Sequence, residues 1–275
     1  MQDSYFPLDF FRRNQTLKSY FEDSVDNDKK AKEDKEIRLI AVDFTFANAI
    51  NLLRENKTII QCISGCWHGN KFIKHLDYIE GYSASNNLKA VKRVKEIFLN
   101  YEADFIVFDL RNGGEVLYDE FAKLGFTVLE RNYFGTVSES KYEDLRGRCF
   151  SPDSIPCIIP IIGSGELNHS VWIELKKQLE IDNCKFLVNE SEKAEEMRCD
   201  EKQYNLTSDE WVKILSPYIE SEFMIFEAIS LQQEWKNNRI KLIEPRHGSK
   251  YSILTFAYGN YILTRIEQKL SNKDF

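Results

Sequence analysis

Continuous and alternating apolar segments divide the central part of the chain into strands and helices. Apolar runs at residues 37–46 and 58–67, rich in β-branched side chains, are typical of strands. The alternating segment 71–82 follows after a short turn and predicts a third strand. Residues 86–101 repeat apolar side chains at helical spacing, with lysines on the other faces. The apolar run at 104–110 then predicts a strand that is buried on both faces.

This order of elements predicts a mixed sheet. Three antiparallel strands, a helix and a strand that returns beside the first require the last pairing to be parallel, with a right-handed crossover. Further strands are predicted at 155–163, 184–188 and 239–245, and further helices at 115–125, 168–180, 207–235 and 250–270. The predicted fold class is therefore α/β, with a mixed sheet flanked by helices.

The chain is expected to contain one folded domain after a tail. Residues 1–36 are polar and charge-dense after an aromatic start, which predicts an N-terminal tail or linker, and residues 37–275 form the predicted domain. The 275 residues are 43% hydrophobic, which is enough for a sizeable core. Since no apolar run approaches the roughly 20 residues that a bilayer requires, the protein is expected to be soluble and cytoplasmic, without a membrane partner.

Charge and cysteine content limit the possible chemistry. The net charge of −7 argues against a general nucleic-acid binder, so any such role requires local basic patches or metal ions. The six cysteines are scattered, and no disulfide framework is predicted. Cys62 and Cys66, with His68 and His75, suggest zinc, but their spacing is loose and no second cysteine pair lies near them in the sequence. Buried or half-exposed thiols are the favoured interpretation.

Asp43 and Asp109 lie near the ends of the two strands that are predicted to be parallel neighbours. The carboxyl ends of such strands are where open α/β sheets place their ligand sites. Two carboxylates within a few ångströms repel each other unless a proton or a cation lies between them. A divalent metal ion between the two carboxylates would remove this repulsion, and such ions commonly catalyse phosphodiester cleavage. Taken singly, each Asp also fits a structural role at a turn that follows a strand.

Several segments between residues 37 and 262 carry a family resemblance, and their order is more specific than any one of them. They are RLIAVDFTFAN, YIEGYSASNNLKAVKRVKEIF, ADFIVFDLRNGGEVLYDEF, FLVNESEKAEEM, SPYIESEFMIFEAISLQ, IKLIEP and KYSILTFAYGNY. In this order they resemble the C-terminal nuclease domain of the large terminase subunit of tailed bacteriophages, which has an RNase H-like fold. The opening aromatic segment is similar to the end of the ATPase domain that precedes it in that family.

The resemblance implies a metal-dependent endonuclease that cuts concatemeric phage DNA, in which genomes are joined end to end. The cut is made during genome packaging in the host cytoplasm. Asp43 matches the first acidic residue of the family and Asp109 the second, while Asp119 matches an acidic position with a structural role. The implied cofactor is Mg²⁺ or Mn²⁺ in a two-metal site, with Asp43 on the side of the attacking water and Asp109 on the side of the leaving oxygen. The implied partners are double-stranded DNA, a separate ATPase subunit, the small terminase and the portal.

Two features depart from the family pattern. No phosphate-loop sequence G-x-x-x-x-G-K-[ST] occurs, so this chain is not expected to be a complete motor. The family's third Asp, near the start of the last helix, is replaced here, with Ser249 at the expected position. Glu244 and His247 are candidate substitute ligands, although a water-facing Glu and a loop His are the alternatives. The rival function is a degenerate RNase H-like module that binds DNA or a packaging partner without cutting.

Two basic groups are candidate contacts for DNA phosphates. Arg146 and Arg148 lie in a segment predicted to be a loop. A second group surrounds the last strand and the start of the last helix, close to the predicted metal site, and contains Arg239, Lys241, Arg246 and Lys250. The second group is the stronger candidate because of its position. The alternative for all of these side chains is an ordinary solvated surface.

Overall fold

The structure is a computed structural model that describes nine stretches of the chain. They are residues 4–21, 31–44, 58–69, 71–82, 87–111, 113–149, 151–200, 206–246 and 248–271. Within these stretches, no helix combines the length and the apolar character that a membrane crossing demands.

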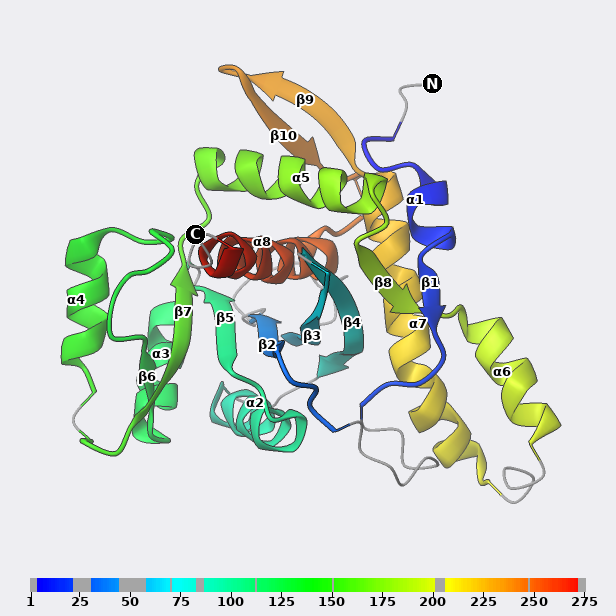
Figure 1. Cartoon of the computed structure of the whole chain (residues 1–275), viewed down its shortest axis with the longest axis horizontal. Helices are drawn as coiled ribbons and strands as arrows, with labels where there is room; N and C mark the ends of the chain where they lie inside the picture. The colour runs from blue at the N-terminus through cyan, green and yellow to red at the C-terminus, as the bar shows by residue number, and fades with distance from the viewer. Residues whose placement is uncertain are drawn as a thin grey trace.

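One mixed sheet organises the described part of the chain (Figure 1). Its eight strands are β1 (Gln15–Leu17), β2 (Glu36–Asp43), β3 (Thr58–His68), β4 (Lys71–Tyr82), β5 (Phe105–Asp109), β6 (Phe126–Val128), β7 (Ile155–Ile161) and β8 (Cys184–Leu187). Their spatial order is β1-β8-β4-β3-β2-β5-β7-β6. β3 is antiparallel to β2 and β4, and the remaining neighbours are parallel. The predicted parallel pairing of β2 with β5 is confirmed.

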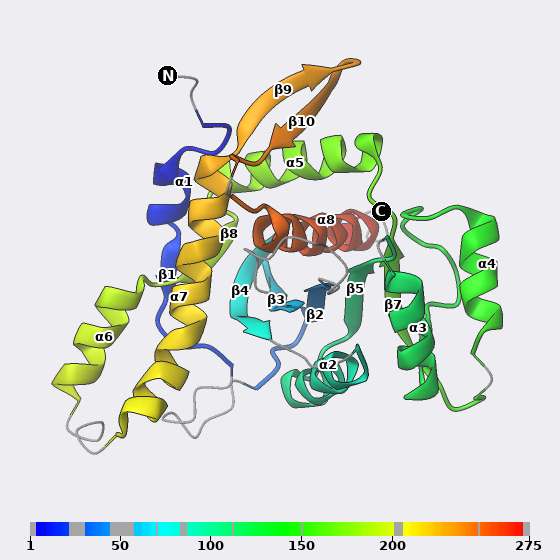
Figure 2. The ribbon, with the colours of Figure 1, turned by 180° about the vertical axis from the view of Figure 1, so that it is seen from behind.

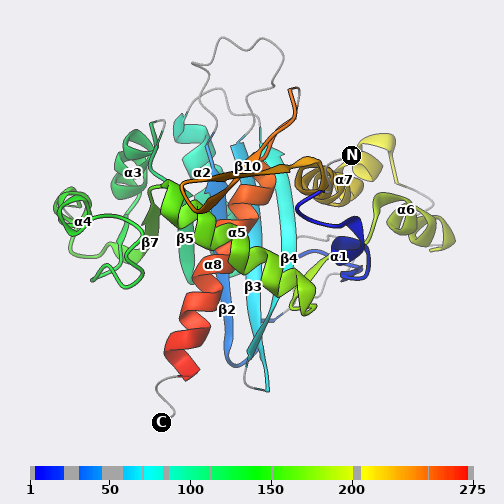
Figure 3. The same cartoon turned by 90° about the horizontal axis from the view of Figure 1, so that it is seen from above.

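Helices cover both faces of this sheet. α8 (Tyr251–Ser271) packs on β2, β3 and β4, and α5 (Gly165–Glu180) lies over α8 (Figures 1 and 3). α2 (Asn87–Tyr101) and α3 (Gly114–Lys123) cover the opposite face, as the view from behind also shows (Figure 2). α7 (Ser208–Ser230) lies against β4 and β8. The shorter helices are α1 (Leu8–Arg12), α4 (Glu139–Gly147) and α6 (Glu190–Cys199).

α8 approaches the sheet closely because of one glycine. Every residue from Ser252 to Thr264 is buried, so this half of the helix is enclosed on all sides. A Cβ atom on Gly259 would lie 2.5 Å from Cδ1 of Ile63 and 3.1 Å from Cδ1 of Leu39. The absent side chain therefore sets the distance between α8 and strands β2 and β3. This packing brings the first turns of α8 over the carboxyl end of β2.

The turn from β5 into α3 also depends on glycine. Gly113 has a φ of 95°, a conformation that glycine adopts without steric cost. A Cβ atom on Gly114 would collide with the carbonyl oxygen of Asp109. The Gly-Gly pair therefore allows the chain to turn sharply directly after Asp109. The helix starts immediately, and Asp109 is held at the end of its strand.

The end of α7 differs from the prediction. The sequence predicted a helix over 207–235, but α7 ends at Ser230, and β9 (Gln232–Lys236) forms a hairpin with β10 (Arg239–Ile243). Asn237 and Asn238 form the turn with φ values of 52° and 57°, which suit a two-residue hairpin connection. Helical periodicity did not reveal this pairing because β9 is mostly exposed. α7 also continues through Pro217, so this proline does not end the helix.

Part of the predicted N-terminal tail is packed against the domain. β1 pairs in parallel with β8 at the edge of the sheet. Phe6 and Phe11 are fully buried, with the ring of Phe11 next to Phe186 and that of Phe6 next to Trp172. Tyr5, Phe6 and Phe11 therefore belong to the core on the α8 side of the sheet, whereas Tyr20 belongs to the core on the opposite face. Residues 22–30, also assigned to the tail, lie outside the described stretches.

We expect Phe11→Ala to lower the free energy of unfolding by about 3–5 kcal/mol, since it removes a fully buried aromatic ring. Leu8→Ala in the same short helix is the control, because Leu8 is 39% exposed and its loss should cost about 0.5 kcal/mol or less. Urea denaturation measures both. Equal and small effects would show that residues 4–21 do not belong to the cooperative unit.

Candidate metal centre

The two predicted aspartates lie side by side. β2 and β5 pair from Leu39 opposite Phe105 to Val42 opposite Phe108, so Asp43 and Asp109 follow at the same level. Both line a small cavity of about 50 Å³, whose other wall is the first part of α8. The sequence predicted this juxtaposition from the order of the elements, and the structure confirms it.

Asp43 has the more unusual environment of the pair. Its Oδ2 is shielded from water, and no hydrogen-bond donor among the described residues meets it. Burial and the nearby Asp109 carboxylate raise the pKa of Asp43 to about 7, although the positive charge of Arg111 acts in the opposite direction. A shielded oxygen without a partner is costly unless a proton or a cation occupies the space beside it. Near neutral pH the Asp43 carboxyl therefore exchanges a proton readily.

Arg111 neutralises the second carboxylate. Its Nε lies 2.8 Å from Oδ2 of Asp109, and its backbone N–H donates to Oδ1 at 2.9 Å. This charge-assisted contact with Asp109 raises the pKa of the Arg111 guanidinium. The fork fits because residue 163 is glycine: a Cβ atom there would collide with the guanidinium of Arg111 and lie 2.5 Å from the Tyr258 hydroxyl oxygen. Arg111 is thus an internal counter-ion at the position where a metal would be expected.

A third carboxylate approaches the pair from α7. Oε2 of Glu227 accepts hydrogen bonds from the backbone N–H groups of Ser252 (2.9 Å) and Ile253 (3.2 Å), at the start of α8. A negative charge at a helix N-terminus is favourable. Burial raises the pKa of Glu227, and its charge in turn contributes to the raised pKa of Asp43. Glu227 therefore caps α8 and adds negative potential to the site.

Tyr258 connects the aspartates to α5. Its hydroxyl donates to Oδ1 of Asn168 at 2.8 Å. Burial raises the pKa of Tyr258, and the neighbouring Asp109 carboxylate raises it further. The hydroxyl thus stays protonated and can serve as a donor. α5, α8 and β5 are joined at this point by polar contacts as well as by apolar packing.

The two aspartates fit a divalent cation such as Mg²⁺. Mg²⁺ is commonly held by one or two carboxylates, with water and substrate phosphate oxygens completing the shell. The unpartnered Oδ2 of Asp43 is an available ligand beside Asp109. In the described part of the chain, however, no three side chains of His, Cys, Asp or Glu converge closely enough to hold an ion by themselves. The donor set is therefore suited to a site that substrate oxygens complete.

Of the two predicted substitute ligands, the structure describes Glu244 and places it away from the aspartates. Glu244 forms an ion pair with Lys250 at 2.8 Å and does not line the cavity of the aspartates. Ser249, at the position of the missing acid, interacts with the Glu227 carboxylate, and its hydroxyl accepts from the Tyr251 backbone N–H at 3.3 Å. A carboxylate at position 249 would therefore face Glu227. His247 lies outside the described residues.

The basic residues fall into two separate regions. Arg146 belongs to α4 and Arg148 follows directly after it, so the predicted loop is a helix. Arg148 pairs with the carboxylates of Glu115, Asp119 and Asp144. On the other side of the molecule, residues of β10 and the segment before α8 carry the second group: Arg239, Lys241, Arg246 and Lys250. Arg239 and Lys241 are exposed, and Lys250 is one residue from the wall of the metal cavity.

Sequence reasoning missed Arg111, Glu227 and Tyr258 as parts of the site. Arg111 had a local signal, because it follows Asp109 by two residues, a spacing at which a side chain can fold back on its neighbour. Glu227 had only the weak signal of an acid inside the apolar stretch FMIFEAIS. Tyr258 had none, since aromatic residues on an apolar helix are core by default. Their roles depend on how α7 and α8 pack.

Known structures share this fold. The large terminase nuclease from thermophilic phage G20c matches with a TM-score of 0.51 and 10% identity, over 94% of this chain and 97% of that chain. The same nuclease with bound magnesium has a TM-score of 0.49 at 10% identity, over 95% and 97%. The nuclease domain of the large terminase subunit gp2 of bacterial virus Sf6 has a TM-score of 0.41 at 12% identity, over 93% and 97%. No protein-family profile and no curated protein matches the sequence.

The likeness to the G20c nuclease identifies the architecture as RNase H-like, the fold class that the sequence predicted. At 10% identity, the likeness establishes the fold alone. The chemistry of the site depends on its own residues.

Asp43→Asn should stabilise the metal-free protein above neutral pH, because it removes a negative charge that burial and the nearby Asp109 carboxylate both disfavour. The pKa of Asp43 is raised from 3.8 to about 7 in the folded protein. Between pH 3.8 and about pH 7 the folded protein therefore binds more protons than the unfolded chain, and the free energy of unfolding falls as the pH rises. At about 1.4 kcal/mol per pKa unit, the gain from the substitution is bounded at about 4 kcal/mol at pH above roughly 8.

Urea denaturation with chelator present, between roughly pH 4 and pH 8, measures this difference. The advantage of Asp43→Asn should shrink towards the acid end. Asp153→Asn is the control, because Asp153 is exposed. A gain that does not vary with pH would contradict the assignment.

Proposed function

We propose that this chain is a divalent-metal-dependent endonuclease domain that cuts concatemeric phage DNA during genome packaging. The observation that carries this proposal is the placement of Asp43 and Asp109 at the carboxyl ends of adjacent parallel strands, with one oxygen of Asp43 shielded and without a partner among the residues that the structure describes. The RNase H-like fold, shared with large terminase nucleases of phages, supports the same substrate class. The cofactor is Mg²⁺ or Mn²⁺, and a host-cytoplasmic location follows from the phage role.

Asp43 and Asp109 are the proposed metal ligands and catalytic residues. When bound, the ion lowers the pKa of a water molecule and polarises the phosphoryl oxygens. Asp43, with its pKa near 7, releases a proton more easily once a positive charge is present beside it. Asp109, which is already paired with Arg111, would be the second ligand to the ion. Glu227, on α7, adds negative potential to the site in place of the acid that the family carries near position 249.

Phosphate contacts are assigned to the cations beside the site. Lys250 precedes α8, and Arg239 and Lys241 project from β10, so all three lie on the α5 and α8 side of the molecule. Arg246 lies in the segment between β10 and α8. Such contacts orient DNA without reading its sequence. A separate ATPase subunit, the small terminase and the portal are the further proposed partners.

A second candidate function is a DNA-binding or partner-binding module that does not cut. The observation that favours it is the contact of Arg111 with Asp109, which already satisfies one of the two ligands. The shortage of converging ligands in the described part of the chain points the same way. The two functions differ in cleavage, so a nicking assay separates them.

Wild-type protein should nick supercoiled plasmid with Mn²⁺ or Mg²⁺ and not with chelator, and Asp43→Asn or Asp109→Asn should reduce the rate at least about a hundredfold. Each substitution replaces an anionic ligand and preserves side-chain size. Asp119→Asn is the control, because Asp119 pairs with Arg148 away from the cavity. If wild-type protein binds DNA without nicking it under any metal condition, the non-cutting function is correct.

Arg111→Gln should tighten Mn²⁺ binding about tenfold, since a charge-assisted hydrogen bond worth about 1.5–3 kcal/mol no longer competes for Asp109. Calorimetric titration in the absence of DNA gives the affinity. Arg148→Gln is the matched control, because Arg148 also bridges carboxylates but lies outside the cavity. Weaker Mn²⁺ binding by Arg111→Gln would show that Arg111 supports the ion's position and does not compete with it.

A further inference from the structure

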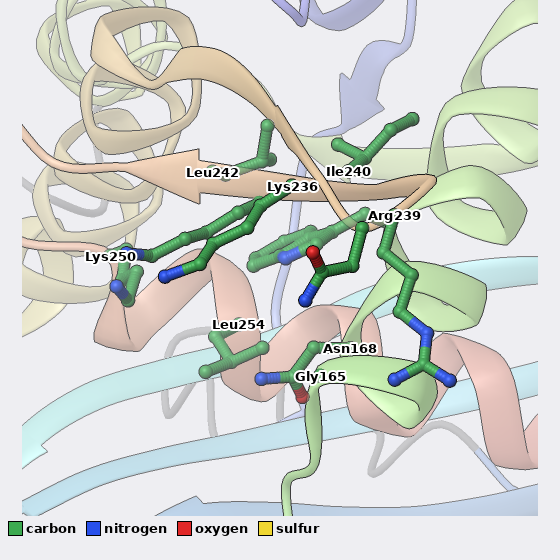
Figure 4. Close-up of a pocket in the computed structure, with 11 residues that line it drawn as sticks. Gly165, Asn168, Lys236, Arg239, Ile240, Leu242, Lys250 and Leu254 are labelled. Atoms are coloured by element: carbon green, nitrogen blue, oxygen red, sulfur yellow. The ribbon is translucent and has the colours of Figure 1, made fainter.

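A second cavity, of about 290 Å³, lies between the β9–β10 hairpin, α5 and the start of α8. Figure 4 shows the side chains of Lys236 and Arg239 extending from the hairpin over this space, with Asn168 and Leu254 on its opposite side. The volume is near the lower end of the roughly 300–1,000 Å³ that is usual for ligand pockets. A duplex is too wide for it, whereas a single nucleotide unit is of suitable size.

The inner surface of the cavity is apolar. Trp172 of α5, Ile240 and Leu242 of β10, and Leu254 of α8 line it, and all four are largely buried. Three separate elements contribute these side chains, so the surface is part of the packed core and not a flexible edge. An inorganic anion gains nothing from such a surface. A ligand with a planar apolar part does gain from it.

The mouth of the cavity is strongly basic, in contrast to the acidic chain as a whole. Lys236, Arg239, Lys241 and Lys250 line the cavity, whereas the chain carries a net charge of −7. Arg239 pairs with Glu166 at 3.2 Å, at a contact where both side chains are largely exposed. Lys236 and Lys241 are exposed, and within the described residues neither ammonium group has a hydrogen-bond or ion-pair partner, although Lys241 lies opposite Glu234 in the hairpin. These two ammonium groups are available to a ligand with phosphate groups.

The hairpin is held in place over the cavity by a specific contact. The backbone N–H of Ile240 donates to Nδ1 of His169 on α5 at 3.0 Å. Ile240 and Leu242 also belong to the core cluster that contains α5 and α8. The wall that carries the cations is therefore ordered before a ligand arrives, which lowers the entropic cost of binding.

The cavity adjoins the metal centre. Leu254 lines both spaces, and Lys250 precedes Tyr251, which lines the metal cavity. Asn168 lines the second cavity and accepts a hydrogen bond from Tyr258, which lines the first. The two cavities are therefore neighbours on the α8 side of the sheet. Leu254 is the lining residue that the two cavities have in common, and no ionisable side chain lines both.

The geometry points to this cavity as a binding site for one unpaired nucleotide of the DNA strand that enters the metal centre. The base contacts the apolar surface of Trp172 and Leu254, and the phosphates contact Lys236 and Lys241. An apolar surface combined with a basic groove is the usual arrangement for single-stranded nucleic acid. The choice of ligand rests on the proposed function, and the site implies local unpairing of DNA next to the cleaved bond.

Fluorescence anisotropy tests this with a labelled single-stranded oligothymidine octamer and an abasic octamer that carries the same number of phosphates. Chelator is present throughout, so cleavage has no part in the measurement. Because a stacked base contributes about 1–3 kcal/mol, wild-type protein should bind the normal octamer roughly tenfold more tightly than the abasic one. Equal binding of the two octamers by wild-type protein would overturn the proposal.

Gly165→Leu is designed to fill the cavity without disturbing the fold. A Cβ atom on Gly165 meets nothing closer than Nη1 of Arg239 at 4.0 Å, so the new side chain has room at the wall of the cavity. The variant should bind both octamers equally, at the wild-type affinity for the abasic one. Gly147→Leu in α4 is the matched control, since a Cβ there meets nothing within 4 Å, and it should keep the preference. An unchanged preference in Gly165→Leu would place the base elsewhere and overturn the proposal.

A double variant, Lys236→Ala with Lys241→Ala, tests the phosphate contacts. Both octamers should bind more weakly, and the slope of log affinity against log salt should fall by about 1.4, since each phosphate contact to a single strand contributes about 0.7. The control replaces the exposed Lys177 and Lys213, away from the cavity, and should leave the slope nearly unchanged. Equal effects of the two double variants would overturn the assignment of Lys236 and Lys241.

These measurements separate the proposal from the proposed function. Octamer preference that depends on Gly165, in a protein that fails to nick plasmid, would retain the nucleotide site and remove the endonuclease. Plasmid nicking that depends on Asp43 and Asp109, without octamer preference, would retain the endonuclease and remove the nucleotide site.

Discussion

Pairing β2 with β5 in parallel brings two strand ends, and the carboxylates on them, to one point at the edge of the sheet. The pairing needs a crossover through α2 and apolar cover on both faces. α8 supplies one cover and approaches closely because Gly259 has no side chain. Since the same helix forms a wall of the metal cavity, the depth of that cavity is a consequence of core packing.

The acidic groups at this point repel one another, and the surrounding residues compensate for this repulsion in different ways. Arg111 supplies a positive charge to Asp109, and the start of α8 supplies backbone donors to Glu227. Oδ2 of Asp43 meets no hydrogen-bond donor among the described residues, and burial together with the nearby Asp109 carboxylate raises the pKa of Asp43 to about 7. The residue with the least compensation is the one best suited to accept a cation, because a cation relieves both its desolvation and its repulsion.

Element types followed from periodicity wherever burial was one-sided or complete. β2 to β5, α2 and α8 were predictable because their apolar patterns last long enough to be distinctive. The β9–β10 hairpin was missed because exposed strands show little apolar pattern, so its cavity against α5 could not be anticipated either. The packing of residues 4–21 was hidden by their polar neighbours, although Phe6 and Phe11 carried the signal.

The sequence by itself determined the antiparallel and parallel pairing of β2 to β5 and the meeting of Asp43 with Asp109, because both follow from local periodicity and the handedness of one crossover. It also showed that no acid replaces the family's third residue after Pro245 in the segment that starts the last helix. Only the tertiary structure decided that Glu227 approaches from α7, that Arg111 folds back on Asp109, and that basic side chains overhang an apolar cavity. These contacts join residues from separate elements, and their distances depend on how helices pack, which no local pattern encodes.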